Sequence, residues 1–175
     1  FEFSESSEDE RKTEMYRQEK QRNDLSVRFN SIDDYLASLD LKIKISWDNK
    51  IPVSRASQMT QKTNQFNLTT KRYTEANVLC MVRNPSYMLA TFEVEDNYGD
   101  YGVTGMIIIK QDKEFVNRGI IDNFLMSCRI IGRNIEYKIF DELIPNLREK
   151  GISNIQAEYV ATNKNSQVEF FYEKI

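Results

Sequence analysis

The hydrophobic residues of this chain change their spacing from segment to segment, and this alternation limits the folds that it can adopt. Between 135 and 147, Ile, Phe and Leu recur every three or four residues, which predicts a helix with one buried face. Apolar and polar residues alternate, or apolar residues form short runs, in segments that are typical of strands: 41–47, 87–94, 103–109 and 120–126. The strands at 87–94, 103–109 and 120–126 are expected to form an antiparallel meander that leads into the helix at 135–147, which acts as a crossover. This order predicts an α/β (α+β) fold.

Caps and breaks mark the remaining elements. Residues that commonly open helices precede three short helices, which we expect over 32–39, 54–66 and 75–83. On the third of these, Ala76, Leu79 and Cys80 are expected to face the core. A strand over 155–160 and a helix from Asn165 through Tyr172 complete the predicted order.

The composition excludes several kinds of chemistry. The chain has no histidine, which excludes a Ser-His-Asp triad, a Cys-His dyad and any His-ligated metal site. Its two cysteines, Cys80 and Cys128, are too few for a four-cysteine zinc site, so we expect no metal. Lys and Arg number 24 against 27 Asp and Glu, and this net charge of −3 argues against nucleic acid as a partner.

The N-terminal region differs in composition from the rest of the chain. Residues 1–24 are charged and carry a thin apolar stripe, so we expect a helical connector over 1–40 and one domain over 41–175. The chain begins at Phe1 and ends inside a predicted helix, which suggests a piece of a longer protein with an incomplete C-terminal domain. No signal peptide and no apolar run of about 20 residues are present, so we expect a cytoplasmic protein without a membrane segment.

The loop between the strand 120–126 and the helix 135–147 carries the strongest local motif. Arg129, Gly132 and Asn134 follow the spacing R-x-x-G-x-G/A, with Asn134 in place of the last small residue. Backbone N–H groups at a helix N-terminus attract anions, and Arg129 and Arg133 add positive charge that suits a pyrophosphate. Phe124 and Met126, at the end of the strand, are assigned to the same binding site.

A second motif lies about 30 residues later. Asn165, Val168 and Tyr172 match the pattern N-x-x-A-x-x-φ-Y, with Val168 in place of Ala. Together the two motifs resemble those of the GNAT N-acetyltransferases. The resemblance implies a mixed, mostly antiparallel sheet flanked by helices and a pyrophosphate of coenzyme A at the first motif. It further implies that Asn165 contacts the pantetheine and that Tyr172 protonates the departing thiolate.

A more specific resemblance covers most of the chain. The strings at 55–73, 96–102 and 124–136 are similar to those of FkbH-like proteins. These proteins join a haloacid-dehalogenase-like phosphatase domain to a C-terminal GNAT-like domain. The resemblance implies that this domain helps to load a glyceryl-type acyl unit onto an acyl carrier protein, from CoA or carrier-bound phosphopantetheine. The D-x-D motif of the phosphatase is absent from the sequence, so no phosphatase activity is expected.

Cys128 is the candidate nucleophile. It lies between a strand end and a predicted helix N-terminus, next to Arg129, and such surroundings favour a thiolate. A small buried residue at a strand end is the structural alternative. Tyr172, Glu136 and Asp122 are candidates for proton transfer, although carboxylates at such positions are also common structural partners.

A polar cluster precedes these motifs. Lys62, Asn64, Gln65 and Asn67 could orient a polar substrate, as could Asp96, or they could cap turns. Three functions remain open from the sequence. The domain is an acyltransferase acting on CoA or carrier thioesters, a non-catalytic docking module for a carrier's phosphopantetheine, or a plain acetyl-CoA-dependent N-acetyltransferase.

Overall fold

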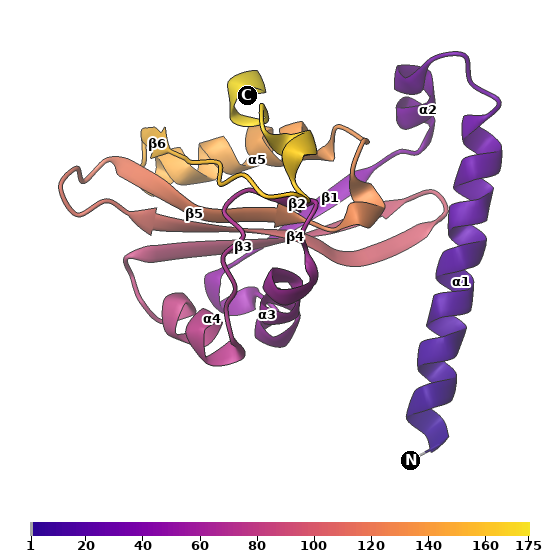
Figure 1. Cartoon of the computed structure of the whole chain (residues 1–175), viewed down its shortest axis with the longest axis horizontal. Helices are drawn as coiled ribbons and strands as arrows, with labels where there is room; N and C mark the ends of the chain where they lie inside the picture. The colour runs from indigo at the N-terminus through magenta and orange to yellow at the C-terminus, as the bar shows by residue number, and fades with distance from the viewer. Residues whose placement is uncertain (1) are drawn as a thin grey trace. The chain divides into compact units, whose positions relative to one another are not determined.

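The computed structural model describes residues 2–175 (Figure 1). These residues form two compact units, one comprising the chain up to Ile43 together with Val94–Gly102, the other comprising Lys44–Glu93 and Val103–Ile175. The described helices and strands are, in chain order, α1 Glu2–Ser26, α2 Ile32–Ser38, β1 Lys42–Trp47, α3 Val53–Lys62, β2 Phe66–Asn67, α4 Glu75–Val82, β3 Tyr87–Asp96, β4 Gly99–Gln111, β5 Arg118–Met126, α5 Ile135–Glu149 and β6 Asn154–Gln156. The boundary predicted at residue 40 stays a prediction.

The first unit is organised around the carboxylate of Asp96. Arg22 of α1 donates to both of its oxygens, at 2.7 and 2.8 Å, and the Tyr101 hydroxyl donates to Oδ2 at 2.7 Å. The Arg22 guanidinium also lies 4.1 Å from the centre of the Tyr101 ring. The side chains of Arg22 and Asp96 are 3% and 0% exposed, so a buried ion pair anchors a helix that has almost no apolar face.

The sheet places β5 in its interior. The strand order is β1-β3-β4-β5-β2, and β6 runs parallel to β5. β4 and β5 pair in antiparallel register, with a shift between Ile108 and Ile109. The predicted α/β fold with a mostly antiparallel sheet is confirmed.

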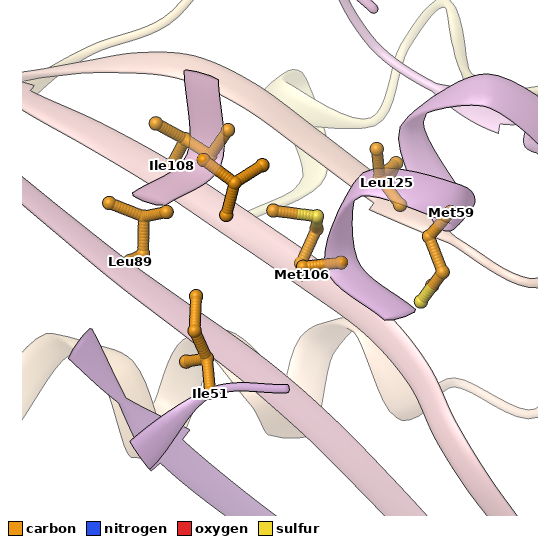
Figure 2. Close-up of a cluster of buried hydrophobic side chains, with 8 residues drawn as sticks. Ile51, Met59, Leu89, Met106, Ile108 and Leu125 are labelled. Atoms are coloured by element: carbon orange, nitrogen blue, oxygen red, sulfur yellow. The ribbon is translucent and has the colours of Figure 1, made fainter. Parts of the chain in front are cut away.

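Helices cover both faces of the sheet in the second unit (Figure 1). α3 and α4 lie on one face, and α5 and the C-terminal segment lie on the other. Figure 2 shows the core under α3, in which Met59 of this helix belongs to the same buried cluster as Met106 and Leu125 of the sheet. On the opposite face the ring of Phe124 packs against three other aromatic rings at 5.2–5.5 Å, those of Phe66, Phe140 and Phe171. Each such buried ring contributes about 1.5–3 kcal/mol.

Several predicted elements differ from the structure. The helix expected over 54–66 ends at Lys62, because Phe66 turns into the aromatic cluster and begins β2 instead. The strand expected over 155–160 ends at Gln156. Cys80, together with Ala76 and Leu79, is exposed rather than buried, because the eight-residue helix α4 turns Val78 to the core.

The helix expected from Asn165 through Tyr172 is replaced by two short 3-10 turns, Ser166–Val168 and Tyr172–Lys174. The side chain of Asn165 bonds to the preceding loop and makes no capping hydrogen bond, so no regular helix starts there. Within residues 2–175, no helix is both long enough and apolar enough to cross a membrane.

Candidate active site

The turn between β5 and α5 presents an open helix N-terminus. Gly132 has a φ of 81°, and a Cβ added there would meet no atom within 4 Å. Asn134, the N-cap of α5, has a left-handed φ of 55° and makes no side-chain capping bond. The 15-residue helix thus starts without a side-chain cap from Asn134, and a helix N-terminus favours an anion. The N–H of Glu136, in the first turn, is bonded to the carboxylate of the same residue.

Arg129 and Arg133 flank this turn and are both half-buried. The Arg129 Nε donates to Ser127 Oγ at 3.2 Å, which fixes the start of its side chain. Both arginines thus lie on the segment where the sequence predicted a phosphate contact.

Cys128 lies on a short 3-10 turn, Cys128–Ile130, and is exposed. α5 begins at Ile135, so the thiol is not at the helix N-terminus that was expected to activate it. The buried alternative is also wrong. Its role as a nucleophile stays a prediction.

Glu136 and Tyr172 hold polar atoms without a partner in the protein. Among the described residues, the buried side-chain atoms that lack a hydrogen bond are Thr91 Oγ1, Asn123 Oδ1, Glu136 Oε2 and Tyr172 Oη. Two of these four belong to predicted proton-transfer residues. Because buried polar atoms are nearly always bonded, unpaired ones point to a missing ligand or to chemistry.

The two side chains come from segments that pack together. The ring of Tyr137, next to Glu136, lies 6.0 Å from the ring of Phe171, next to Tyr172. Burial raises the pKa of Glu136, an effect that its own backbone N–H and Lys174 partly oppose. Burial also raises the pKa of Tyr172, and the charge of Glu158 adds to this. Tyr172 therefore keeps its proton at neutral pH.

Asp122 is engaged within the protein. Lys71 Nζ lies 2.7 Å from its Oδ1, and the Tyr73 hydroxyl donates to its Oδ2. Burial, followed by this bond to Asp122, raises the pKa of Tyr73. Both carboxylate oxygens are thus used to tie the segment before α4 to β5, so this geometry favours a structural role over proton transfer.

The polar cluster 62–67 divides between surface and interior. Lys62 and Gln65 are exposed, and the Asn64 Oδ1 accepts a bond of 2.5 Å from Arg72. Asn67 is fully buried, and its side chain bonds the carbonyl of Thr63 and the N–H of Thr70. Asn67 thus holds its own turn, while Lys62 and Gln65 remain accessible to a substrate.

Residues 66–69, which we call the inner segment, lie along the edge of β5 beyond its pairing with β6. Phe66 pairs with Met126, and the Leu68 N–H donates to the Phe124 carbonyl at 3.0 Å. On its other side, the Leu68 carbonyl accepts from the Val160 N–H at 2.8 Å. The inner segment is buried throughout and acts as an added strand.

Asn165 fastens the inner segment. Its Nδ2 donates to the Asn67 carbonyl at 2.9 Å and to the Val160 carbonyl at 3.0 Å. Its Oδ1 accepts from Thr162 and from the Tyr159 hydroxyl, and the residue is 0% exposed. Phe124, Met126 and Asn165, which the sequence analysis assigned to cofactor binding, therefore use these groups to bind the chain itself.

Asp96 belongs to the unit that contains α1 and α2, where Arg22 and Tyr101 engage its carboxylate. This predicted substrate contact is therefore a buried anchor within its own unit.

One residue near the site was not predicted. Arg55 on α3 is half-buried, and Arg129 lowers its pKa in addition to burial. It lies 74 positions before Arg129, so no local motif could have joined the two.

Solved structures share this fold. The chain aligns with the ribosomal-protein-S18-alanine N-acetyltransferase of Escherichia coli over 76% of each chain, with 15% identity and a TM-score of 0.55. It also aligns with Ard1 of Thermoplasma volcanium, over 77% of this chain and 80% of that one, with 18% identity and a TM-score of 0.53. An aminoglycoside N-acetyltransferase in complex with CoA gives 11% identity, coverage of 77% and 86%, and a TM-score of 0.52.

The fold is that of the GNAT N-acetyltransferases. No family model matches the chain, and no curated protein sequence matches it either. The narrower resemblance to FkbH-like proteins stays a prediction.

Proposed function

We propose that this chain is an acyltransferase domain that binds a CoA-type thioester and uses Tyr172 and Glu136 to move protons. The proposal is carried by the two unpaired buried atoms, Tyr172 Oη and Glu136 Oε2, on segments that pack against each other. Structural neighbours of this fold are named as acetyltransferases, and one is described as a complex with CoA. A bound CoA-type thioester would supply an activated acyl group.

The phosphate end of such a ligand fits the residues present. The turn at Gly132, the start of α5, where Asn134 makes no side-chain cap, and the positive charges of Arg129 and Arg133 would receive a pyrophosphate. The predicted contact of Asn165 with the pantetheine does not fit, because its amide is bonded to the inner segment.

The chemistry of the chain's own residues follows from their burial. A tyrosine with a raised pKa holds its proton at neutral pH and can donate it to a developing thiolate. A carboxyl group with a raised pKa is a stronger base once ionised, so Glu136 can accept a proton from an incoming nucleophile. Cys128, exposed on the preceding turn, is a further nucleophile for a covalent transfer.

The substrate follows the narrower resemblance. We propose a glyceryl-type acyl unit, an acyl carrier protein as partner and a haloacid-dehalogenase-like phosphatase domain in the same protein, acting in the cytoplasm. Lys62 and Gln65, exposed after α3, are the members of the predicted substrate cluster that can contact such a unit.

The second function is a domain that only docks a carrier's phosphopantetheine, without transferring its acyl group. Because residues 66–69 occupy the edge of β5, neither this module nor the transferase can bind the thioester arm along that edge. The two functions therefore differ in whether the acyl group is transferred, and the experiment measures this difference.

An assay of free thiol separates the transferase from the docking module. It measures the thiol released from acetyl-CoA and from an acyl-loaded carrier when candidate amine and thiol acceptors are present. Acyl transfer predicts a loss of about 10²-fold or more in Tyr172→Phe, since general acid catalysis contributes about that factor. Tyr16→Phe, at a tyrosine that is 79% exposed on α1, is the matched control. If calorimetry shows that the wild-type protein binds CoA or the carrier but the assay detects no thiol release, the docking module is the correct function and the transferase is rejected.

A further inference from the structure

The helix α4 is apolar on more than one side. Six of its eight residues are apolar, but only Val78 is buried. Ala76, Leu79 and Cys80, which we call the α4 stripe, share one side of the helix through their i, i+3 and i+4 spacing, and all three are exposed. A helix that is apolar all round is normally buried, so the α4 stripe is a surface that another element can cover.

The helix that carries the α4 stripe is fixed at its start. Thr74 and Asn77 form a reciprocal capping box, in which each side chain bonds the backbone of the other residue. The Ser54 hydroxyl donates to the Glu75 Oε1 at 2.7 Å, which ties α3 to α4. A preformed surface loses little conformational entropy when a partner binds, so this rigidity favours binding.

A groove of about 380 Å³ borders the α4 stripe, because Cys80 lines it together with Arg72, Met81 and Tyr87. The Arg72 guanidinium donates to the Thr63 carbonyl at 2.8 Å, and its other two acceptors are also neutral. These bonds position the charge of Arg72 without cancelling it. The groove therefore offers apolar side chains and one fixed positive charge to a ligand.

The segment that forms α3 and α4 is basic. Residues 49–92 contain six Lys or Arg and one Glu, which is a net charge of +5 in a chain whose total is −3. Lys62, Arg72 and Arg83 are exposed, and no described carboxylate forms an ion pair with them. A partner with an acidic surface would be attracted to this segment.

We propose that the α4 stripe and its groove bind an acidic amphipathic helix of a partner protein. Apolar side chains of that helix would cover Leu79 and Cys80, and its carboxylates would pair with Arg72 and Arg83. A basic surface alone could also attract nucleic acid, but the exposed apolar stripe favours a protein. The inference goes beyond the proposed function, because α4 and α5 cover opposite faces of the sheet (Figure 1), and its test requires no acyl transfer.

The test measures the binding of a labelled synthetic helix to the whole chain by fluorescence anisotropy. This acidic peptide has about 18 residues, with leucines spaced by three and four positions and glutamates at most other positions. A second peptide carries lysine in place of every glutamate, and a single-stranded oligouridylate RNA represents nucleic acid. We expect the acidic peptide to bind at least tenfold more tightly than either of these probes, and its affinity to fall as salt is added.

Matched variants on the two faces of the sheet locate the site. Leu79→Asn should weaken binding of the acidic peptide about fivefold or more. Ile144→Asn on α5 should not, although the two side chains are 37% and 36% exposed. Arg83→Glu should also weaken binding about fivefold, whereas Arg148→Glu, at an exposed position of α5, makes the same change in net charge and should have little effect.

The thiol of Cys80 gives a second readout inside the groove. In the Cys128→Ser background it is the single thiol of the chain, and the acidic peptide should slow its alkylation by iodoacetamide, a neutral reagent. The proposal is overturned if the acidic peptide shows no binding with a Kd below about 1 mM, or if both peptides bind equally. Equal losses in the matched variants would also overturn it. Tighter binding of the RNA than of the acidic peptide would reject a protein partner in favour of nucleic acid.

Discussion

Two buried regions that both contain predicted functional carboxylates differ in how their polar atoms are satisfied. Around Asp96, an arginine, a tyrosine hydroxyl and backbone N–H groups engage the carboxylate. At the start of α5, Glu136 Oε2 has no partner in the protein, and neither has Tyr172 Oη on the adjoining segment. Buried acids with complete partners stabilise a fold, whereas unpaired ones are candidates for chemistry.

The largest expected effect comes from removing a partner of the Asp96 carboxylate. Arg22→Met leaves the Asp96 carboxylate buried without its cation, and removing one partner of a buried ion pair costs about 3–5 kcal/mol. Urea denaturation, with limited proteolysis of α1 as a second readout, should detect this loss. Arg17→Met on the same helix is the control, because its pair with Glu14 is exposed and contributes about 1 kcal/mol or less. Equal losses in the two variants would contradict a structural role for Asp96.

The next prediction makes the same change, Tyr→Phe, at a tyrosine whose hydroxyl has a partner and at one whose hydroxyl has none. Tyr73→Phe removes a hydroxyl that donates to Asp122, and hydrogen bonds to charged groups contribute about 1.5–3 kcal/mol. Tyr172→Phe removes a buried hydroxyl that has no partner, so the free energy of unfolding should stay the same or rise. Chemical denaturation of the two variants measures both values. A larger loss in Tyr172→Phe would show that its hydroxyl is bonded in solution.

A third prediction concerns the inner segment. Asn165→Leu removes the two donors to the Asn67 and Val160 carbonyls without burying a charge, which should cost about 1–3 kcal/mol. Hydrogen exchange of the Leu68 amide, whose N–H donates to the Phe124 carbonyl, should become faster in this variant. Asn163→Leu, at an exposed position two residues earlier, is the control and should leave that amide protected. If the exchange of the Leu68 amide is unchanged in Asn165→Leu, Asn165 does not hold the inner segment in place.

The smallest effect is a pH dependence of opposite sign at two carboxylates. Because burial raises the pKa of Glu136, the folded protein binds its proton more tightly, and stability falls as pH rises from about 4.5 through the folded pKa. Glu136→Gln should therefore raise the Tm at pH 8 relative to wild type and not at pH 4.

Asp112 provides the opposite case. Bonds from the Glu114 N–H and from Arg118 lower its pKa, so its stabilisation is present at neutral pH and is lost as pH falls through the folded pKa. Asp112→Asn should lower the Tm at pH 7. The same direction of change in both variants at pH 7–8 would contradict the contrast.

The regular elements could be predicted from the sequence because their signals are local. The helix at 135–147 and the strands at 87–94 and 120–126 lie within α5, β3 and β5, since each carries a complete hydrophobic period. The prediction of a C-terminal helix from Asn165 was wrong. The Asn165 side chain bonds to the Asn67 carbonyl, 98 positions earlier, and no local pattern reveals this contact.

The candidate site was predictable to a similar extent. The turn at Arg129, Gly132 and Asn134 was singled out from its spacing, and the structure gives Gly132 and Asn134 a left-handed backbone, whereas its role in binding an anion stays a prediction. The partners of Asp122 and the approach of Arg55 to Arg129 join distant segments, so they required the structure.

The inner segment also sets the order in which this domain can be completed. Residues 66–69 are held by β5, synthesised about 55 residues later, and by Asn165, 98 positions after Asn67. At about 5–20 residues per second, the ribosome takes roughly 5–20 seconds to supply that asparagine. During this interval Phe66 and Leu68 lack their final partners, so the nascent chain exposes an apolar strand that a chaperone can recognise.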